Sequence, residues 1–123
     1  MSRDRKGSAL FLLRMIEACE KIRAYVKNTS EPEFLKKTES YDAICMQFSH
    51  MGEQVQGLLA SSEGIVRHFP DDVDWPALRG LRNQIDHNYA AVEPARIWAF
   101  AVDEIEEIES SLRRILKKRF GRP

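Results

Sequence analysis

The chain has 123 residues, enough for one domain that buries most of the surface its unfolded form would expose. Apolar residues make up 43% of the sequence and charged residues 31%, which is typical of a globular protein. The 19 basic and 19 acidic residues cancel, which argues against broad, non-specific binding to nucleic acid but leaves room for a small basic site.

The sequence also gives an expectation about where the protein works. No run approaches the ~20 apolar residues that cross a bilayer, and the short run at residues 9–13 has no cleavage-site context for a signal peptide. We therefore expect no membrane association. Cys19 and Cys45 fall on the apolar stripes of expected helices, so we expect small core residues in a reducing cytosol rather than a disulfide. These features together predict a cytoplasmic protein.

The first half of the chain is predicted to form two long helices joined by a short one. Residues 1–7 are polar and expected to be frayed, and residues 8–27 carry apolar side chains at steps of three and four. Ser30, with Glu33 three residues later, is a capping-box pattern and should start a short helix that ends near residue 37. The same three-and-four spacing over residues 40–60 predicts the second long helix. Inside it lies Gly52, which can permit close approach of another helix.

The second half is predicted to contain a short turn and two further helices. Residues 61–69 should form a turn, and a Pro-Asp-Asp loop follows. The next helix should span residues 75–87, because Asp74 can cap it and Pro76 suits its first turn. After a link at residues 88–92, the spacing of apolar residues predicts one helix over residues 94–118, roughly 37 Å long.

These elements predict an all-α fold. The three long helices share one apolar period and short connections, so neighbouring helices should be antiparallel, and the helix at residues 75–87 becomes a shorter fourth member. No strand pattern or internal repeat competes with this interpretation. We expect a single domain, residues 1–123, folded as an up-and-down antiparallel helical bundle.

The helix at residues 75–87 carries an unusual charge. Its apolar face is formed by four residues within an arc of roughly 120°: Trp75, Leu78, Leu81 and Ile85. Arg82 falls inside the same arc, and its guanidinium cannot lose its charge. Burial therefore requires a partner, either Asp86 one turn later or an anion from elsewhere. His87 and Tyr89 follow, so a fixed cation, an imidazole and a phenol lie close together in the sequence.

The spacing of Arg82, His87 and Tyr89, after a helix that begins with Trp75 and before Ile97 and Trp98, resembles the HepT family. HepT proteins are HEPN-domain toxins of prokaryotic toxin–antitoxin systems, and the resemblance extends over nearly the whole chain. It implies a HEPN-like bundle, a homodimer with a shared cleft, and cleavage of transfer or messenger RNA. It also implies that Asn83 helps to orient the site. A partner nucleotidyltransferase of the MntA type would silence the toxin by transferring AMP to Tyr89.

These side chains suit RNA cleavage without a metal or a cofactor. An imidazole can take the proton of a ribose 2′-hydroxyl or give one to the leaving oxygen, and an arginine can neutralise charge on phosphorus. The product would carry a 2′,3′-cyclic phosphate. His50 and His68 show no metal-ligand spacing, so we expect no metal site. On a regular helix Arg82 and His87 point roughly 140° apart, so they converge only if the helix unwinds or if two subunits share the site.

Plainer interpretations stay open for each of these residues. Arg82 can simply pair with Asp86 while His87 ends the helix, and Tyr89 can pack on the face of Trp75. Arg79 can extend the phosphate site or remain a solvated charge. The acidic start and basic end of residues 103–119 complement a helix dipole, although the basic end could also guide RNA. For the whole protein, the alternative is a non-catalytic helical subunit on which a nucleotidyltransferase docks.

Overall fold

A computed structural model describes residues 2–121, with side chains from residue 7 onward. Over this range the chain is all-α, as the sequence predicted, and contains no strand. In chain order the elements are α1 (Ser2–Lys27), α2 (Glu31–Leu35), α3 (Glu39–Ala60), α4 (Ile65–His68), α5 (Trp75–His87), the 3₁₀ turn η1 (Tyr89–Ala91), α6 (Pro94–Asp103) and α7 (Ile105–Phe120).

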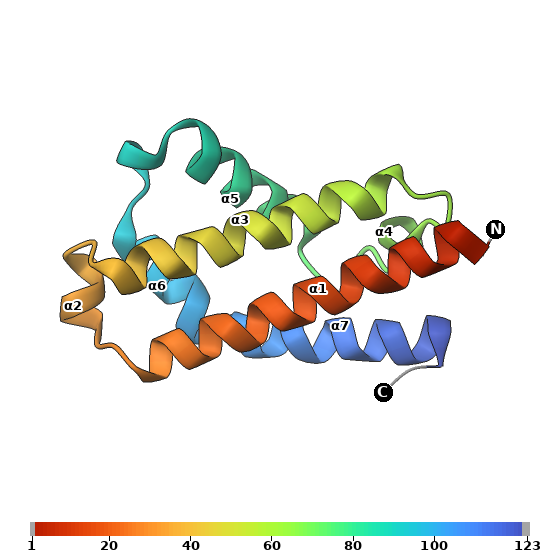
Figure 1. Cartoon of the computed structure of the whole chain (residues 1–123), viewed down its shortest axis with the longest axis horizontal. Coiled ribbons are helices and arrows are strands. Elements are labelled where there is room, and N and C mark those ends of the chain that lie inside the picture. The colour runs from red at the N-terminus through yellow and green to blue at the C-terminus, as the bar shows by residue number, and fades with distance from the viewer. Residues whose placement is uncertain (1, 122–123) are drawn as a thin grey trace.

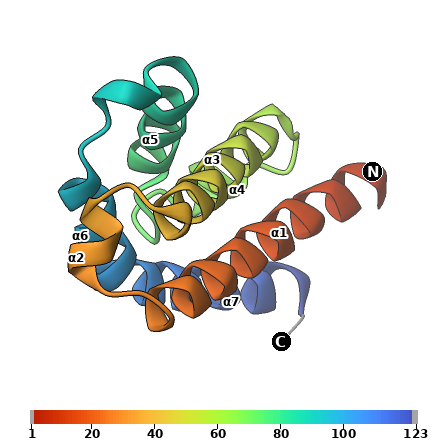
Figure 2. The same cartoon turned by 60° about the vertical axis from the view of Figure 1, so that its left-hand side comes forward.

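The long helices lie side by side in the order α5, α3, α1, α7, and each runs antiparallel to its neighbour (Figures 1 and 2). The helices α2 and α6 pack against each other at one end of this row, where the Phe34 and Trp98 rings lie 5.1 Å apart. The expected up-and-down bundle is therefore confirmed. Since α5 and α7 occupy the two outer positions of the row, each packs on the bundle with one face and leaves the other to solvent.

The core is built from the spaced apolar residues that the sequence singled out. Fully buried side chains come from every long helix, and the largest are Trp75, Tyr41, Phe34, Phe48, Leu12, Met15, Ile22, Ile44 and Met51. Cys19 and Cys45 are buried free thiols, as expected. Among the described residues, no helix is both long and apolar enough to cross a membrane.

Two expected helix starts are confirmed by their caps. The Ser30 hydroxyl accepts a hydrogen bond from the Glu33 backbone N–H at 3.4 Å and opens α2. The Asp74 carboxylate accepts one from the Ala77 N–H at 3.1 Å and opens α5, with Pro76 in its first turn. The indole N–H of Trp75 donates to the Phe69 carbonyl oxygen at 2.9 Å, which ties the start of α5 to the end of α4. These bonds fix where α5 begins.

Two expectations about helix ends are wrong. The helix α1 already begins at Ser2, so residues 2–7 are helical rather than frayed, while Met1 lies outside the described residues. The polar residues here include Arg and Lys, which are good helix formers. The helix expected over residues 94–118 is divided at Glu104, whose backbone (φ −118°, ψ −26°) separates α6 from α7. The helix α6 packs on both α2 and α1, whereas α7 packs mainly on α1, so the two halves lie in different directions.

The helices α3 and α5 approach each other most closely at Gly52. A Cβ atom built on this glycine would lie 2.3 Å from the Arg82 Cβ and 2.8 Å from the Leu78 carbonyl oxygen. Real Cβ atoms are not found at such distances, so any larger residue would force α5 outward. The expected close approach is therefore confirmed, and it places the stem of Arg82 directly on α3.

Candidate active site between α5 and α3

Arg82 lies at the edge of the α3–α5 interface, with 30% of its side chain exposed. Its Nε is 3.1 Å from the Asp86 Oδ2, within ion-pair distance. That buried Nε nevertheless has no hydrogen-bond partner, because the N–H does not point at the carboxylate. No described residue contacts Nη1 or Nη2. Asp86 is therefore only a partial partner, and the outer edge of the guanidinium can still bind an anion.

A residue of α3 holds Asp86 in this position. The Ser49 hydroxyl donates a hydrogen bond of 2.7 Å to the Asp86 Oδ1, while the other oxygen faces Arg82. Sequence analysis did not identify Ser49. The only signal was its place one turn before Gly52, which acquires meaning once the register of α3 against α5 is known. Asp86 thus has a positioning role between two helices.

His87 is the last residue of α5, and its side chain is exposed. The helix stays regular through His87 and ends at Asn88, where φ is −153°. The unwinding that could have turned His87 toward Arg82 does not occur, and the two side chains remain roughly 140° apart around α5. The imidazole contacts no polar group of the described residues. One copy of the chain therefore does not bring Arg82 and His87 together.

Tyr89 follows on η1 and turns back toward α3. Its hydroxyl donates a hydrogen bond to the Asp42 carboxylate, and its ring lies 5.8 Å from that of Tyr41. Burial, together with this hydrogen bond, raises the pKa of Tyr89 above its ordinary value. The side chain still has 39% of its surface exposed. Tyr89 therefore packs on α3, and Asp42 is a second contact that sequence analysis missed.

The remaining residues of interest make fewer contacts. Asn83 and Arg79 are exposed on α5, and neither pairs with a described residue. Gln84 accepts a hydrogen bond from Arg96 at 2.8 Å, which ties α5 to α6. Among the described residues, no group of three or more His, Cys, Asp or Glu could hold a metal ion.

A cleft of about 350 Å³ lies where α3 meets the end of α5 and η1. Its lining combines apolar and acidic side chains with two hydroxyls: Asp42, Cys45, Met46, Ser49, Ile85, Asp86 and Tyr89. Burial raises the pKa of the Cys45 thiol to about 11, so this cysteine is a poor nucleophile at neutral pH. A larger hollow of about 890 Å³ lies over the α1–α2–α3 connections and contains none of the candidate site residues. We place the site at the smaller cleft because Tyr89 and Asp86 line it and Asp86 contacts Arg82.

The basic end of α7 has structural partners. Arg119 donates to the Glu63 carbonyl oxygen at 3.0 Å and lies 3.4 Å from the His68 ring nitrogen. These contacts fasten α7 to the segment around α4, at the end of the bundle away from η1 (Figure 1). The expected complement to the helix dipole is present, with Glu106 and Glu107 in the first turn and Lys117, Lys118 and Arg119 in the last.

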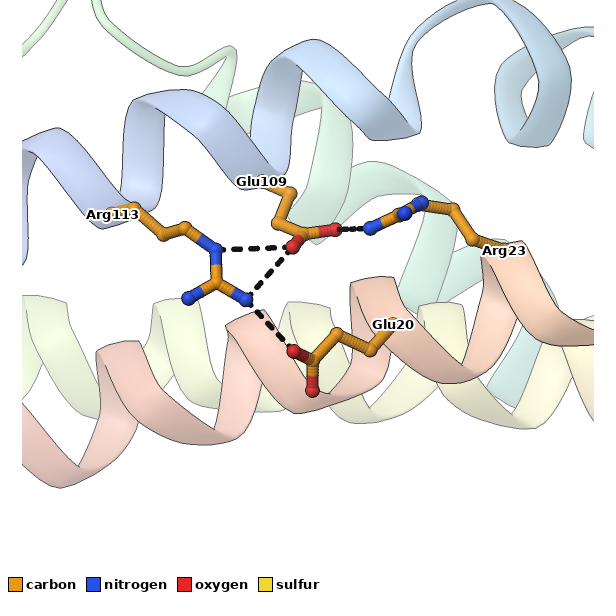
Figure 3. Close-up of polar contacts among 4 residues, drawn as sticks. All are labelled: Glu20, Arg23, Glu109 and Arg113. Carbon is orange, nitrogen blue, oxygen red and sulfur yellow. Dashed lines mark hydrogen bonds and ion pairs between the residues drawn. The ribbon is translucent and has the colours of Figure 1, made fainter. Parts of the chain in front are cut away.

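Each residue of a charged cluster between α1 and α7 has a partner of opposite charge (Figure 3). The buried carboxylate of Glu109 accepts from Arg23 at 2.5 Å and from two nitrogens of Arg113 at 2.9 and 3.0 Å. Arg113 also donates to Glu20 at 2.7 Å. The bonds to Glu109 raise the pKa of both arginines further. Every oxygen of Glu109 has a donor, so nothing in this cluster points to a ligand.

Comparison with known proteins shows which family the chain resembles. Residues 15–115 match the family model described as ribonuclease HepT-like. A candidate RNase of Caldanaerobacter subterraneus subsp. tengcongensis is 29% identical over 88% of this chain and 93% of its own length. A candidate RNase of Methanocaldococcus jannaschii is 26% identical over 87% of this chain and 85% of its own length.

A second protein of Methanocaldococcus jannaschii, named as a gamma-glutamylcyclotransferase and candidate RNase, is 21% identical over 93% of this chain. The match covers half of that protein's length, so it carries a further region that this chain does not match. No solved structure matches the chain at a comparable level.

Proposed function

Because the chain belongs to the HepT-like ribonuclease family, we propose that it is a metal-independent endoribonuclease in which Arg82 and His87 are the reacting groups. The observation that carries the proposal is the incompletely paired guanidinium of Arg82 beside a cleft. Asp86 engages it only at Nε, which leaves the two terminal nitrogens for a phosphate. Asn83, exposed beside Arg82, is proposed to help orient the substrate, and Arg79 to extend the phosphate site.

The proposed reaction uses the ribose as its own nucleophile. One imidazole takes the proton of the 2′-hydroxyl as its oxygen attacks phosphorus, and the bond from phosphorus to the 5′-oxygen breaks. A second imidazole gives that oxygen a proton, which leaves a 2′,3′-cyclic phosphate and a free 5′-hydroxyl. Arg82 neutralises the charge that develops on the phosphoryl oxygens. No water, metal or cofactor is consumed in this step.

We propose that the working unit is a homodimer. Since α5 stays helical through His87, a site with Arg82 and His87 together needs a second copy of the chain. A two-fold axis near the end of α5 would bring the His87 of each copy to the other's Arg82. It would also place two imidazoles in one cleft, one for each proton transfer.

We further propose that Tyr89 is the site of regulation. The Tyr89 side chain is 39% exposed and lines the cleft, and an AMP group on its hydroxyl would place an anion near Arg82 and obstruct RNA. The transferring enzyme would be a nucleotidyltransferase of the MntA type. The pair would then act as a toxin and its antitoxin in a prokaryotic cytoplasm, with transfer or messenger RNA as the target.

Two variants test the ribonuclease function. His87→Ala and Arg82→Ala should each lower the rate of RNA cleavage by at least about a hundredfold, because each removes a group that acts in the transition state. Both side chains are partly or largely exposed, so circular dichroism should show unchanged helical content. Arg79→Ala on the same helix serves as a milder comparison. Wild-type cleavage by both variants would contradict the proposal.

The competing function is a non-catalytic subunit on which a nucleotidyltransferase docks. The exposed His87, which contacts no polar group of the described residues, and the zero net charge favour this alternative. Mass spectrometry of the chain co-expressed with such an enzyme separates the two. AMP on Tyr89 supports a regulated toxin, whereas a tight, unmodified complex without RNA cleavage by the free chain supports a docking subunit.

A further inference from the structure

We propose that the 350 Å³ cleft between α3 and η1 is a nucleobase pocket that accepts bases with an exocyclic amino group and disfavours uracil. This assignment depends on the ribonuclease function proposed above, because it identifies the part of the RNA that lies next to the cleaved phosphate. It concerns residues outside the motif, chiefly Asp42 and Met46.

The shape and lining of the cleft suit a flat aromatic ring. Cys45 and Ile85 are nearly fully buried and form an apolar floor, while Met46 stands at the rim with 56% of its surface exposed. The Tyr89 side chain, 39% exposed, also lines the cleft and is held in place by Tyr41 and Asp42. Single-stranded RNA is recognised in this way, by unstacked bases that lie against aromatic side chains.

The polar groups of the cleft determine which hydrogen-bonding groups a bound base must have. Ser49 and Arg82 already engage the two oxygens of Asp86. Asp42 accepts from Tyr89 with Oδ1, and no described residue donates to its Oδ2. An ionised carboxylate accepts hydrogen bonds only. The amino groups of guanine, adenine and cytosine can donate to it, whereas the single N–H of uracil lies between two carbonyl oxygens that the carboxylate would repel.

The position of the cleft favours a nucleotide over a positively charged side chain. Two carboxylates beside an apolar floor would also accommodate the side chain of an arginine or lysine from a partner. Arg82 stands next to the same cleft, however, because Asp86 both lines the cleft and contacts its Nε. A ligand that joins a base to a phosphate satisfies both features, and a cationic side chain satisfies only the first.

The test measures binding separately from cleavage. Short single-stranded oligodeoxynucleotides that differ only in one central base, with deoxyuridine at the other positions, have no 2′-hydroxyl and cannot be cut, so their affinity is measured without cleavage. By fluorescence anisotropy, the wild-type chain should bind the deoxyguanosine, deoxyadenosine and deoxycytidine versions about tenfold more tightly than the deoxyuridine version. Cleavage of the matching ribonucleotide versions is measured in parallel.

The sharpest variant is Asp42→Asn. An asparagine can still accept the Tyr89 hydrogen bond with its amide oxygen, while its NH₂ replaces the free acceptor with a donor. We expect discrimination against uracil to disappear, because the uracil carbonyl oxygens now find a donor. Met46→Ala should weaken all four oligonucleotides several-fold through lost contact with the base. Leu59 is another apolar residue of α3, 45% exposed and outside the cleft, so Leu59→Ala is the matched control and should change nothing.

The outcomes separate this proposal from the ribonuclease function. Equal affinity for all four bases, or an Asp42→Asn variant that weakens all four equally, overturns the pocket even if RNA is cleaved. A base preference that Asp42→Asn abolishes supports the assignment of the base pocket even if no RNA is cleaved. In that case only the reaction assigned to Arg82 and His87 is contradicted. Displacement of every oligonucleotide by an arginine-rich peptide, with no base preference, assigns the cleft to a protein partner and also overturns the proposal.

Discussion

Each of the two outer helices of the bundle carries a charged residue that faces its neighbour, and the two residues differ in how completely they are hydrogen-bonded. Between α7 and α1, Glu109 is buried and accepts three hydrogen bonds from two arginines. Between α5 and α3, Arg82 has one carboxylate within ion-pair distance and no hydrogen bond at Nε. Both regions would count as salt bridges by distance. Glu109 has a donor on each of its oxygens, whereas the buried Nε of Arg82 has no acceptor.

The difference shows how a structural charge can be told from a functional one. A buried charge whose hydrogen bonds are all made within the protein can hold helices together, but it has nothing left to offer a ligand. A half-buried charge with free donors beside a cleft stays partly unsatisfied until an anion arrives. This contrast is why we assign function to Arg82 and stability to Glu109.

The largest expected effect is the loss of wild-type activity in a mixture. Wild-type chain unfolded and refolded with a ninefold excess of His87→Ala chain should lose about nine-tenths of its RNA cleavage. Random exchange leaves only about a tenth of the wild-type chains paired with each other, and a mixed dimer lacks one of the two imidazoles that the shared cleft needs. The measurement is the rate of RNA cleavage per wild-type chain after refolding.

The control is the same amount of wild-type chain refolded alone. If the mixture with His87→Ala chain cleaves RNA as fast as this control although mixed dimers form, the site does not combine residues of two chains.

The next effect is on stability and should occur at the α1–α7 cluster. Glu109→Gln removes the negative charge that two arginines share, so the free energy of unfolding should fall by about 2 kcal/mol. Asp86→Asn should lower it by less than about 1 kcal/mol, because that pair is partly exposed. Urea unfolding followed by circular dichroism measures both changes. An equal loss in the two variants would mean that the regions do not differ in their structural role.

The smallest expected effect is on the pH dependence of the free energy of unfolding. It comes from the two buried thiols, Cys19 and Cys45, one in each region. Burial, and then the charge of Glu109, raises the pKa of Cys19 to about 12, and burial raises that of Cys45 to about 11. A raised pKa in the folded chain means that the unfolded thiol loses its proton first. The stabilisation is therefore complete below about pH 9 and is lost as pH rises toward the folded values.

Urea unfolding between pH 8 and pH 10.5 measures this loss. Stability should fall as pH rises, and Cys19→Ala should flatten the slope more than Cys45→Ala does, because its pKa is raised further. A slope that neither substitution changes would mean that other groups account for the alkaline loss of stability.

Much of the fold could be predicted because its signals are local. The apolar spacing and the caps at Ser30 and Asp74 marked helices that the structure contains. The break at Glu104 could not be predicted in this way, since Ala101 and Ile105 keep the apolar period on both sides of it and both are buried. Before this break α6 packs on α2 as well as on α1, and no local pattern of the sequence encodes that tertiary contact.

Only the α5 and η1 side of the candidate site could be predicted from the sequence. Arg82, Asp86, His87 and Tyr89 lie within eight residues, so their grouping was visible in the sequence. Their partners Ser49 and Asp42 lie 37 and 47 residues away along the chain and look like ordinary polar residues of a helix. Only the register of α3 against α5 gives these two residues a role.

Gly52 has a consequence for how such a protein tolerates sequence change. It takes no part in any reaction, yet the space of a single hydrogen atom at this residue decides how far the Arg82 side chain stands from the neighbouring helix. A one-carbon increment there would shift the guanidinium while leaving its chemistry intact. The residue that is least free to vary in this region is therefore the smallest one, rather than any that touches the substrate.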